Sequence, residues 1–267
     1  MKKYLYTFKL YFLNAMQYRF NFVVSTLFGI MDVSITILFW VLIYHSNGGT
    51  AINSYTLYDM ITYFVVSRFS RCFILSAVGF QYANNIKAGS LSGLLLKPYN
   101  IGLSMYFGNL GNSIMQAIPQ LIAFGLLVSL FLHRFLTWNI TGLNAIFLFV
   151  FFIVSTVSSH LLWSILGELA FFMEEATAVL WSFTVLLNFL TGYFIPLDFF
   201  PAWSVSIIEK LPFSSWVFIP TKIYLGVYTL ESMTLLLVVN LAWLPVLYWI
   251  KQLLWKYGMK KYSSVGG

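Results

Sequence analysis

The sequence contains a succession of long apolar runs, and these runs constrain the fold more than any other feature. A helix needs about 20 apolar residues to cross a bilayer, and backbone groups in lipid must form their hydrogen bonds within the chain. Of the 267 residues, 60% are hydrophobic and only 9% are charged. The runs do not alternate as the strands of a membrane barrel do, so they predict an all-α polytopic membrane protein. The six expected transmembrane helices, all in one domain over 1–267, are 22–44, 56–80, 103–132, 142–166, 177–195 and 233–250.

Residues 1–21 precede the first run and follow a different pattern. Apolar side chains recur at helical spacing, and polar side chains fall on the opposite face. This pattern is typical of an amphipathic helix that lies in the membrane interface, with its lysines near anionic lipid. The length of the pattern disfavours the alternative, an irregular start of the first span. The face predicted to meet lipid consists of Tyr4, Leu5, Phe8, Tyr11, Phe12, Ala15 and Met16.

The segment 196–226, between the fifth and sixth runs, is apolar but rich in proline. Its four prolines prevent it from forming one spanning helix, because proline removes a backbone donor and clashes with the preceding turn. Yet it is too apolar for a free loop. We expect short re-entrant helices that dip into the membrane from one side, which is tolerated where such backbone packs on protein.

Basic residues are unevenly divided between the two sides of this arrangement. Cytoplasmic loops carry an excess of lysine and arginine, so the richer side is predicted to be cytoplasmic. Both termini and the loop 81–102 would then face the cytoplasm of a multi-pass plasma-membrane protein, and 196–226 would be external. Basic residues at the ends of spanning helices explain the net charge of +7, so we expect no nucleic-acid partner. The ten basic residues of one side are Lys2, Lys3, Lys9, Arg19, Lys87, Lys97, Lys251, Lys256, Lys260 and Lys261, and the three of the other are Arg134, Lys210 and Lys222.

A short segment, 84–100, is punctuated by glycine and serine and lies in the predicted cytoplasmic loop. Lys87 and Lys97 flank a predicted helix there, and Pro98 closes it. A helix of two turns is marginal alone in water, so its apolar face needs a partner. The residues leave two partners open, a second protein or the membrane surface. The apolar face consists of Ala88, Leu91, Leu94 and Leu95.

Three charged residues lie inside the first two apolar runs. Asp32 in the first run, and Arg68 and Arg71 in the second, reach similar depths at the helical rise per residue. A lone charge at that depth costs at least about 2.5 kcal/mol, so such groups normally pair or face a wet cavity. We predict that Asp32 pairs with Arg68 or Arg71. The other arginine would then have no acidic partner and would line a translocation path.

Sequence patterns for catalysis are largely absent. The chain has no phosphate-cradling glycine-rich loop followed by lysine and serine or threonine, and no paired metal-ligand motif. We therefore expect no enzyme activity, metal or cofactor in this chain. Ser158, Ser159 and His160 form a polar patch in the fourth run that favours hydrogen bonds between helices. Glu168 is predicted to lie in a solvated loop.

Two motifs resemble those of ABC-2 type transporter permeases, in particular the drug and viologen exporters. Together with the amphipathic start and the six predicted spans, these two motifs in this order extend the resemblance over nearly the whole chain. The first motif, in the predicted cytoplasmic loop, consists of Ile86, Gly89, Leu91, Leu95, Lys97, Pro98 and Asn100. The second, after the fifth run, consists of Gly192, Ile195, Pro196, Phe200, Pro201, Leu211, Pro212, Phe213, Pro220 and Gly226.

The resemblance implies the permease subunit of an ATP-binding cassette exporter, with multidrug efflux as one expected role. A separate ATPase subunit would bind ATP and magnesium, and a second permease, identical or related, would complete the path. The external gate would include Pro196, Phe200, Pro201, Pro212, Phe213 and Pro220. The coupling helix seated in the ATPase, with a second contact from two glutamates, would use Ile86, Lys87, Ala88, Gly89, Leu91, Leu94, Leu95, Lys97, Pro98, Glu174 and Glu175.

Two other function classes serve as alternatives. A membrane-embedded lipid-modifying enzyme would need convergent polar groups, for which only His160 with Ser158 and Ser159 offers a start. A passive channel would have no use for an apolar face on a cytoplasmic helix.

Overall fold

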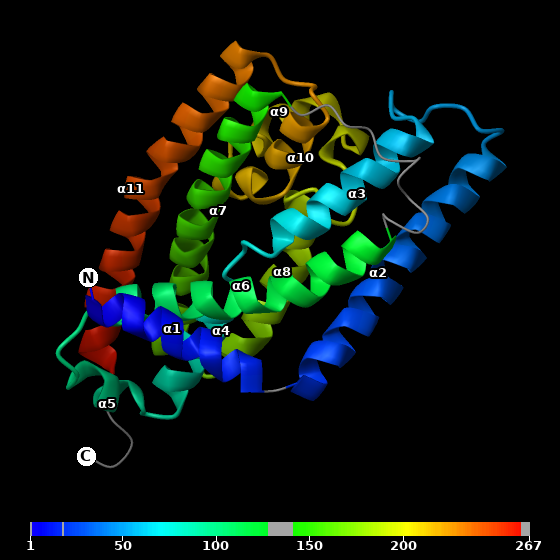
Figure 1. Ribbon diagram of the computed structural model, residues 1–267. Coiled ribbons are helices and arrows are strands. Elements are labelled where there is room, and N and C mark those ends of the chain that lie inside the picture. Colours follow the sequence, from blue (N-terminus) through cyan, green and yellow to red (C-terminus); the bar gives the residue numbers. More distant parts are fainter. Residues whose placement is uncertain (1, 18, 128–140, 263–267) are drawn as a thin grey trace.

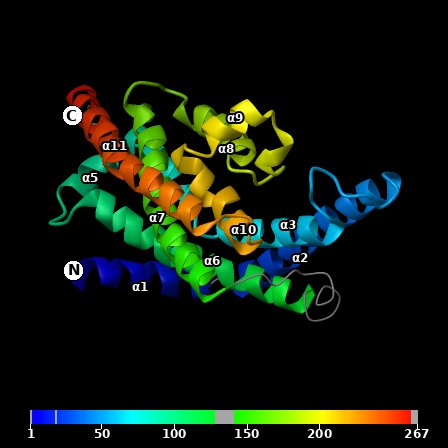
Figure 2. The ribbon, with the colours of Figure 1, turned by 90° about the horizontal axis from the view of Figure 1, so that it is seen from above.

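The computed structural model describes residues 2–17, 19–127 and 141–262, and these are helical with no strand beyond one isolated bridge (Figures 1 and 2). The α-helices are α1 (Lys2–Gln17), α2 (Arg19–Ser46), α3 (Leu57–Arg71), α4 (Ala77–Lys87), α5 (Leu91–Leu95), α6 (Ile101–Leu127), α7 (Gly142–Glu168), α8 (Ala176–Leu190), α9 (Ala202–Ile208), α10 (Phe218–Tyr224) and α11 (Leu230–Lys261). Short 3₁₀ turns are η2 (Leu169–Phe171), η3 (Leu197–Phe199) and η4 (Pro212–Trp216).

Helix α7 is the centre of the molecule. It lies beside α11, and the two run in the same direction (Figure 1). In the part of the chain that is described, three helices are long and apolar enough to cross a membrane, namely Val23–Ser46, Gly142–Phe171 and Leu230–Lys261. They correspond to the first, fourth and sixth predicted spans. Helix α8 is apolar but shorter, and residues 128–132 of the third predicted span lie outside the described residues.

The prediction of one continuous helix over 56–80 was wrong. The chain leaves helical geometry between Cys72 and Ser76, so that α3 and α4 are separate helices. At this break the Leu75 backbone N–H donates to Ser159 Oγ of α7 at 3.2 Å. Non-helical backbone at membrane depth requires such protein partners. Hydrophobic periodicity could not reveal the break, because the hydroxyl that accepts the hydrogen bond comes from another helix.

Helix α1 packs along α6, a protein partner that was not predicted for it (Figure 2). Two glycines of α6 permit the close approach. A Cβ added at Gly108 would meet the Tyr11 ring at 3.2 Å, and one at Gly111 would meet the Phe8 carbonyl oxygen at 2.6 Å. Part of the apolar face that was expected to meet lipid is therefore covered by α6.

Two hydrophobic clusters lie along α7. Leu148 and Phe151 belong to the first cluster, with residues of α2, α3, α10 and the start of α11. Trp163 and Leu166 belong to the second, with residues of α4, α8 and η4. Helix α7 therefore connects the two clusters.

The proline-rich segment folds into short helices, as predicted. Two hydrogen bonds tie its neighbourhood to the core, from Tyr63 Oη to the Gly192 carbonyl oxygen at 2.6 Å and from the Phe218 N–H to the Thr191 carbonyl oxygen at 3.0 Å. Gly192 has φ +78°, and a Cβ there would lie 2.6 Å from Tyr63 Oη. Glycine is thus required where the chain turns after α8.

Candidate functional site

The predicted coupling segment, residues 84–100, lies at one end of the molecule, beside the start of α1 and the end of α11 (Figure 1). Helix α4 ends at Lys87, Gly89 turns the chain with φ +71°, and α5 follows. Because Gly89 interrupts the helix, Ala88 does not share a helical face with the leucines. The expected continuous face over Ala88–Leu95 was therefore wrong.

The leucines of this segment differ sharply in exposure. Leu91 is fully buried at 0%, and Leu94 is half-buried. Leu95 is 41% exposed and Leu96, which was not among the predicted contacts, is 88% exposed. The structure thus assigns Leu91 to internal packing and leaves the next turn available to another molecule.

Two further apolar residues are exposed on the segment after η2. Phe172 and Met173, which follow η2, are 39% and 45% exposed. Tyr262 connects the two segments, because its ring packs against Phe171 at 5.9 Å and its hydroxyl donates to the Gly89 carbonyl oxygen at 2.8 Å. We call Leu95, Leu96, Phe172 and Met173 the apolar end patch.

Hydrogen bonds from the chain's two end helices hold the coupling segment. Lys3 Nζ donates to the Pro98 carbonyl oxygen at 2.8 Å, and the Asn100 N–H donates to Tyr4 Oη at 3.2 Å. Tyr262 Oη also accepts the Ser92 N–H at 3.3 Å. These contacts join the segment to both α1 and the end of α11.

The other predicted coupling residues differ in their exposure. Ile86 is buried in α4, while Lys97, Pro98 and Glu174 are exposed. Lys87 Nζ lies 2.9 Å from Glu175 Oε1, with both side chains mainly exposed. The two glutamates therefore share the end of the molecule with α5.

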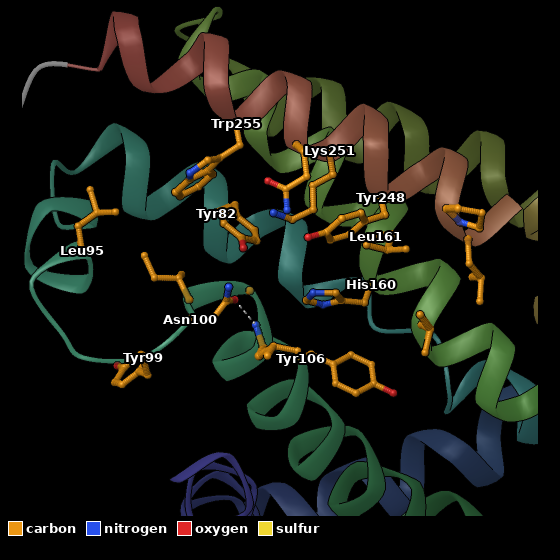
Figure 3. Close-up of a pocket in the computed structure, with 17 residues that line it drawn as sticks. Tyr82, Leu95, Tyr99, Asn100, Tyr106, His160, Leu161, Tyr248, Lys251 and Trp255 are labelled. Atoms are coloured by element: carbon orange, nitrogen blue, oxygen red, sulfur yellow. Dashed lines mark hydrogen bonds between the residues drawn. The ribbon is translucent and has the colours of Figure 1, made fainter. Parts of the chain in front are cut away.

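A cavity of about 730 Å³ lies behind the coupling segment (Figure 3). Leu95, Tyr99 and Asn100 line one side, and side chains of α4, α7 and α11 line the other. His160 is buried at its edge with the Tyr106 ring 5.2 Å away, and His160 Nδ1 has no hydrogen-bond partner among the described residues. The cavity thus lies between the coupling segment and α7.

An ion pair inside this region was not predicted. Lys251 Nζ of α11 lies 3.0 Å from Glu168 Oε1 of α7, and the Glu168 side chain is 0% exposed. Lys251 also lies over the Trp255 and Tyr82 rings, at 5.3 and 5.6 Å from their centroids. The prediction of Glu168 as a solvated loop residue was wrong, because a helix neighbour 83 positions later supplies its counter-ion.

A second buried lysine, Lys222, was counted among the basic residues of the predicted external side. Lys222 Nζ lies 3.0 Å from Asp198 Oδ2 and 3.2 Å from Tyr55 Oη. Tyr55 donates a short hydrogen bond to the same carboxylate, and burial, assisted by Asp198, raises the Tyr55 pKa. Without Lys222 and Lys251, the remaining basic residues are still concentrated on the predicted cytoplasmic side. Arg134 from that count lies outside the described residues.

The predicted gate residues are divided between the two hydrophobic clusters. Phe200 packs against the first cluster and Phe213 against the second. Pro196, Pro212 and Pro220 are buried, and Pro201 is exposed at the start of α9. The gate residues thus do not form one surface in this structure.

The predicted ion pair in the first two spans is present. Arg68 Nε donates to Asp32 Oδ2 at 2.6 Å, and Arg68 Nη2 donates to Thr36 Oγ1 at 2.9 Å. Arg71, the other arginine, donates from Nη1 to Asn188 Oδ1 of α8 at 2.5 Å. The guanidinium carbons of both arginines lie 4.3 Å from the centre of the Tyr193 ring.

The polar patch of α7 forms hydrogen bonds to neighbouring segments, as predicted. Trp216 Nε1 donates to Ser158 Oγ at 2.9 Å, and Ser159 Oγ accepts from Leu75. No hydrogen bond joins His160 to either hydroxyl in the described part of the chain, so the three residues do not form a nucleophile and base. No cluster of metal-ligating side chains was found among the described residues.

Comparison with known proteins gives one clear match. The sequence model of a family described as ABC-2 family transporter protein matches residues 30–266, which is most of the chain. None of the curated proteins matches it.

Proposed function

Since the chain belongs to the ABC-2 family of transporter proteins, we propose that it is the permease subunit of an ATP-driven exporter. Proteins of this family are membrane components of transporters and work with ABC ATPase subunits. In our proposal the coupling segment around α5 binds such an ATPase on the cytoplasmic side. ATP and magnesium belong to that partner, and this chain supplies no catalytic group.

The observation that carries the proposal is the apolar end patch. Leu96 is 88% exposed on a segment that hydrogen bonds hold to both α1 and the end of α11. Burying an exposed leucine against another protein lowers the free energy by about 25 cal/mol for each Å² of apolar surface. A well-anchored apolar surface at this end of the molecule fits a partner that delivers force.

The route of force follows from the anchors. Movement of α5 would be transmitted to α1 through Pro98 and to α11 through Tyr262. Helix α11 packs on α7, which reaches both hydrophobic clusters. We propose that ATPase closure shifts these helices as rigid elements and opens the external segment 196–226. A second permease, identical or related, would complete the path through the plasma membrane.

The test is co-purification with the cognate ATPase, followed by measurement of coupled ATP hydrolysis. We expect a stoichiometric ATPase with the wild-type chain, and Leu96→Asp combined with Leu95→Asp should remove the ATPase or uncouple it. Leu230→Asp is the matched control, because Leu230 is also exposed, at 54%, but lies at the opposite end of α11. Retained ATPase with full coupling in the folded double variant would contradict the proposal.

Leu91→Asp is unsuitable for this test. Leu91 is fully buried, so a carboxylate there would destabilise the loop itself and mimic loss of the ATPase. The contrast between Leu91 and Leu96 therefore separates misfolding from loss of the partner.

The alternatives explain the structure less well. A lipid-modifying enzyme would need an available hydroxyl beside His160, but Ser158 and Ser159 serve as hydrogen-bond acceptors between segments. A passive channel would give the apolar end patch no role. A purified transporter without any ATPase would favour these alternatives.

A further inference from the structure

A second cavity, of about 330 Å³, lies between α2, α3 and α6. Arg68 and Arg71 line it, and Asp32 is the acidic residue among its described lining residues. Its apolar lining includes Phe28, Phe69 and Leu121. Two cations against one carboxylate leave the cavity with a net positive charge inside two predicted spans.

The carboxylate satisfies only one edge of Arg68. Asp32 accepts hydrogen bonds from Nε and Nη2, at 2.6 and 3.4 Å. Nη1 is buried and has no hydrogen-bond acceptor in the described part of the chain. Burying a nitrogen of a charged group without an acceptor costs free energy. A ligand oxygen that accepted a hydrogen bond from Nη1 would remove this cost.

Arg71 has a neutral partner. Its Nη1 donates a hydrogen bond to the amide oxygen of Asn188, which carries no charge. Its guanidinium carbon and that of Arg68 each lie 4.3 Å from the Tyr193 ring centre, so they are at most twice that distance apart. Like charges within that distance repel each other, and an anion near both would offset the repulsion.

We propose that this cavity binds the anionic group, a carboxylate, sulfonate or phosphate, of a transported amphiphile whose apolar body contacts the aromatic lining. The inference rests on the proposed function, since it treats the cavity as part of a transport path. Arginine is suited to the role because its planar donors match the oxygens of such groups. Asp32 would compete with the substrate anion for Arg68 and so favour its release.

The cavity contains a natural probe. Cys72 lines it and is the chain's single cysteine. Two methanethiosulfonate reagents of similar size, one bearing a sulfonate and one a trimethylammonium group, convert its thiolate to a mixed disulfide and release methanesulfinate. The ratio of their rates, divided by the ratio for a free thiol in water, reports the local potential. Changes in thiol pKa cancel in this ratio because both reagents use the same thiolate.

The purified permease in phosphatidylcholine nanodiscs, without any ATPase, is the sample. We expect the normalised ratio to favour the sulfonate reagent by about tenfold or more, as an unneutralised cation at close range requires. Arg71→Gln should lower the ratio, and Asp32→Asn should raise it. Opposite signs cannot result from a general loss of structure. Lys87→Gln removes the same charge outside the cavity and should leave the ratio unchanged.

Binding is then measured by protection of Cys72. In these nanodiscs 1-naphthyl phosphate should slow modification by the uncharged methyl methanethiosulfonate, whereas 1-naphthol should protect at least about tenfold less at equal concentration. A ratio near that of free thiol, equal protection by both naphthalenes, or a Cys72 that no reagent reaches would overturn the proposal. Because no ATPase is involved, such a failure leaves the exporter proposal standing, and loss of ATPase co-purification leaves this result unaffected.

Discussion

The ion pairs Glu168–Lys251 and Asp32–Arg68 have similar N–O separations, 3.0 and 2.6 Å, but very different surroundings. The first is enclosed, with Glu168 at 0% exposure, and has one cation for one carboxylate. In the second, Asp32 is 53% exposed, and Arg71 adds a second cation beside the same cavity. A balanced, enclosed pair can join helices, whereas an unbalanced pair at a cavity retains the capacity to bind an anion.

The largest expected effect comes from breaking the enclosed pair. Lys251→Met would leave the Glu168 carboxylate buried without its counter-ion, and we expect the free energy of unfolding to fall by about 3–5 kcal/mol. Unfolding in mixed micelles with sodium dodecyl sulfate measures it. The double variant Glu168→Gln with Lys251→Met should recover most of the loss, since no charge remains. A double variant as unstable as the single one would show that shape, and not charge, holds the helices.

The packing beside that pair offers a second test. Gly167 precedes Glu168, and a Cβ there would lie 2.4 Å from the Gly79 carbonyl oxygen of α4. We expect Gly167→Ala to cost about 1–3 kcal/mol, because neither backbone can move aside cheaply. Gly93→Ala is the control, since a Cβ at Gly93 meets no atom within 4 Å. Equal stabilities of the two variants in the same unfolding assay would contradict this close helix crossing.

The unbalanced pair should respond differently. Asp32→Asn is expected to cost less than about 1 kcal/mol, because the carboxylate is half-exposed and Arg68 keeps Thr36 and Tyr193 as partners. Export or assembly should nevertheless fall, since Arg68 would lose the anion that competes with substrate. Export into inverted vesicles and the amount of assembled transporter measure this. Normal export and normal assembly together would exclude a transport role for Asp32.

An exposed pair sets the lower limit of the comparison. Lys87 and Glu175 have side chains that are 59% and 73% exposed. Lys87→Gln should change the free energy of unfolding by less than about 0.5 kcal/mol at moderate salt, because solvent screens such pairs. A loss above about 1 kcal/mol, measured at low and high salt, would mean that the 87–175 contact contributes more than its exposure indicates.

Several of these features were predictable from the residues. The cost of charge in lipid predicted that Asp32 would pair with Arg68 or Arg71, and the structure pairs it with Arg68. Proline content predicted the short helices of 196–226. Ser158 and Ser159 were expected to form hydrogen bonds between helices, and they accept hydrogen bonds from Trp216 of η4 and from Leu75 in the break between α3 and α4. In each case a local chemical demand had few ways to be met.

Other features were not predictable. Helical spacing grouped Leu91 with Leu95, although Tyr262 and Gly89 determine how the segment turns and the structure buries Leu91. Charge alone assigned Glu168 to a solvated loop and Lys251 to the basic residues of the cytoplasmic side, although α7 and α11 bring them together. In these cases the decisive partner lies far away in the sequence.

The amino-acid sequence by itself determined a helical, membrane-embedded chain with charges that had to find one another, because composition and helical period set what each segment needs. Only the tertiary structure decided which apolar side chains are covered and which cation stays without a carboxylate. The physical reason is that a leucine gains by contact with lipid, with its own chain or with another protein, and sequence pattern does not distinguish these surroundings. Leu91 and Leu96, five residues apart, therefore differ completely in exposure.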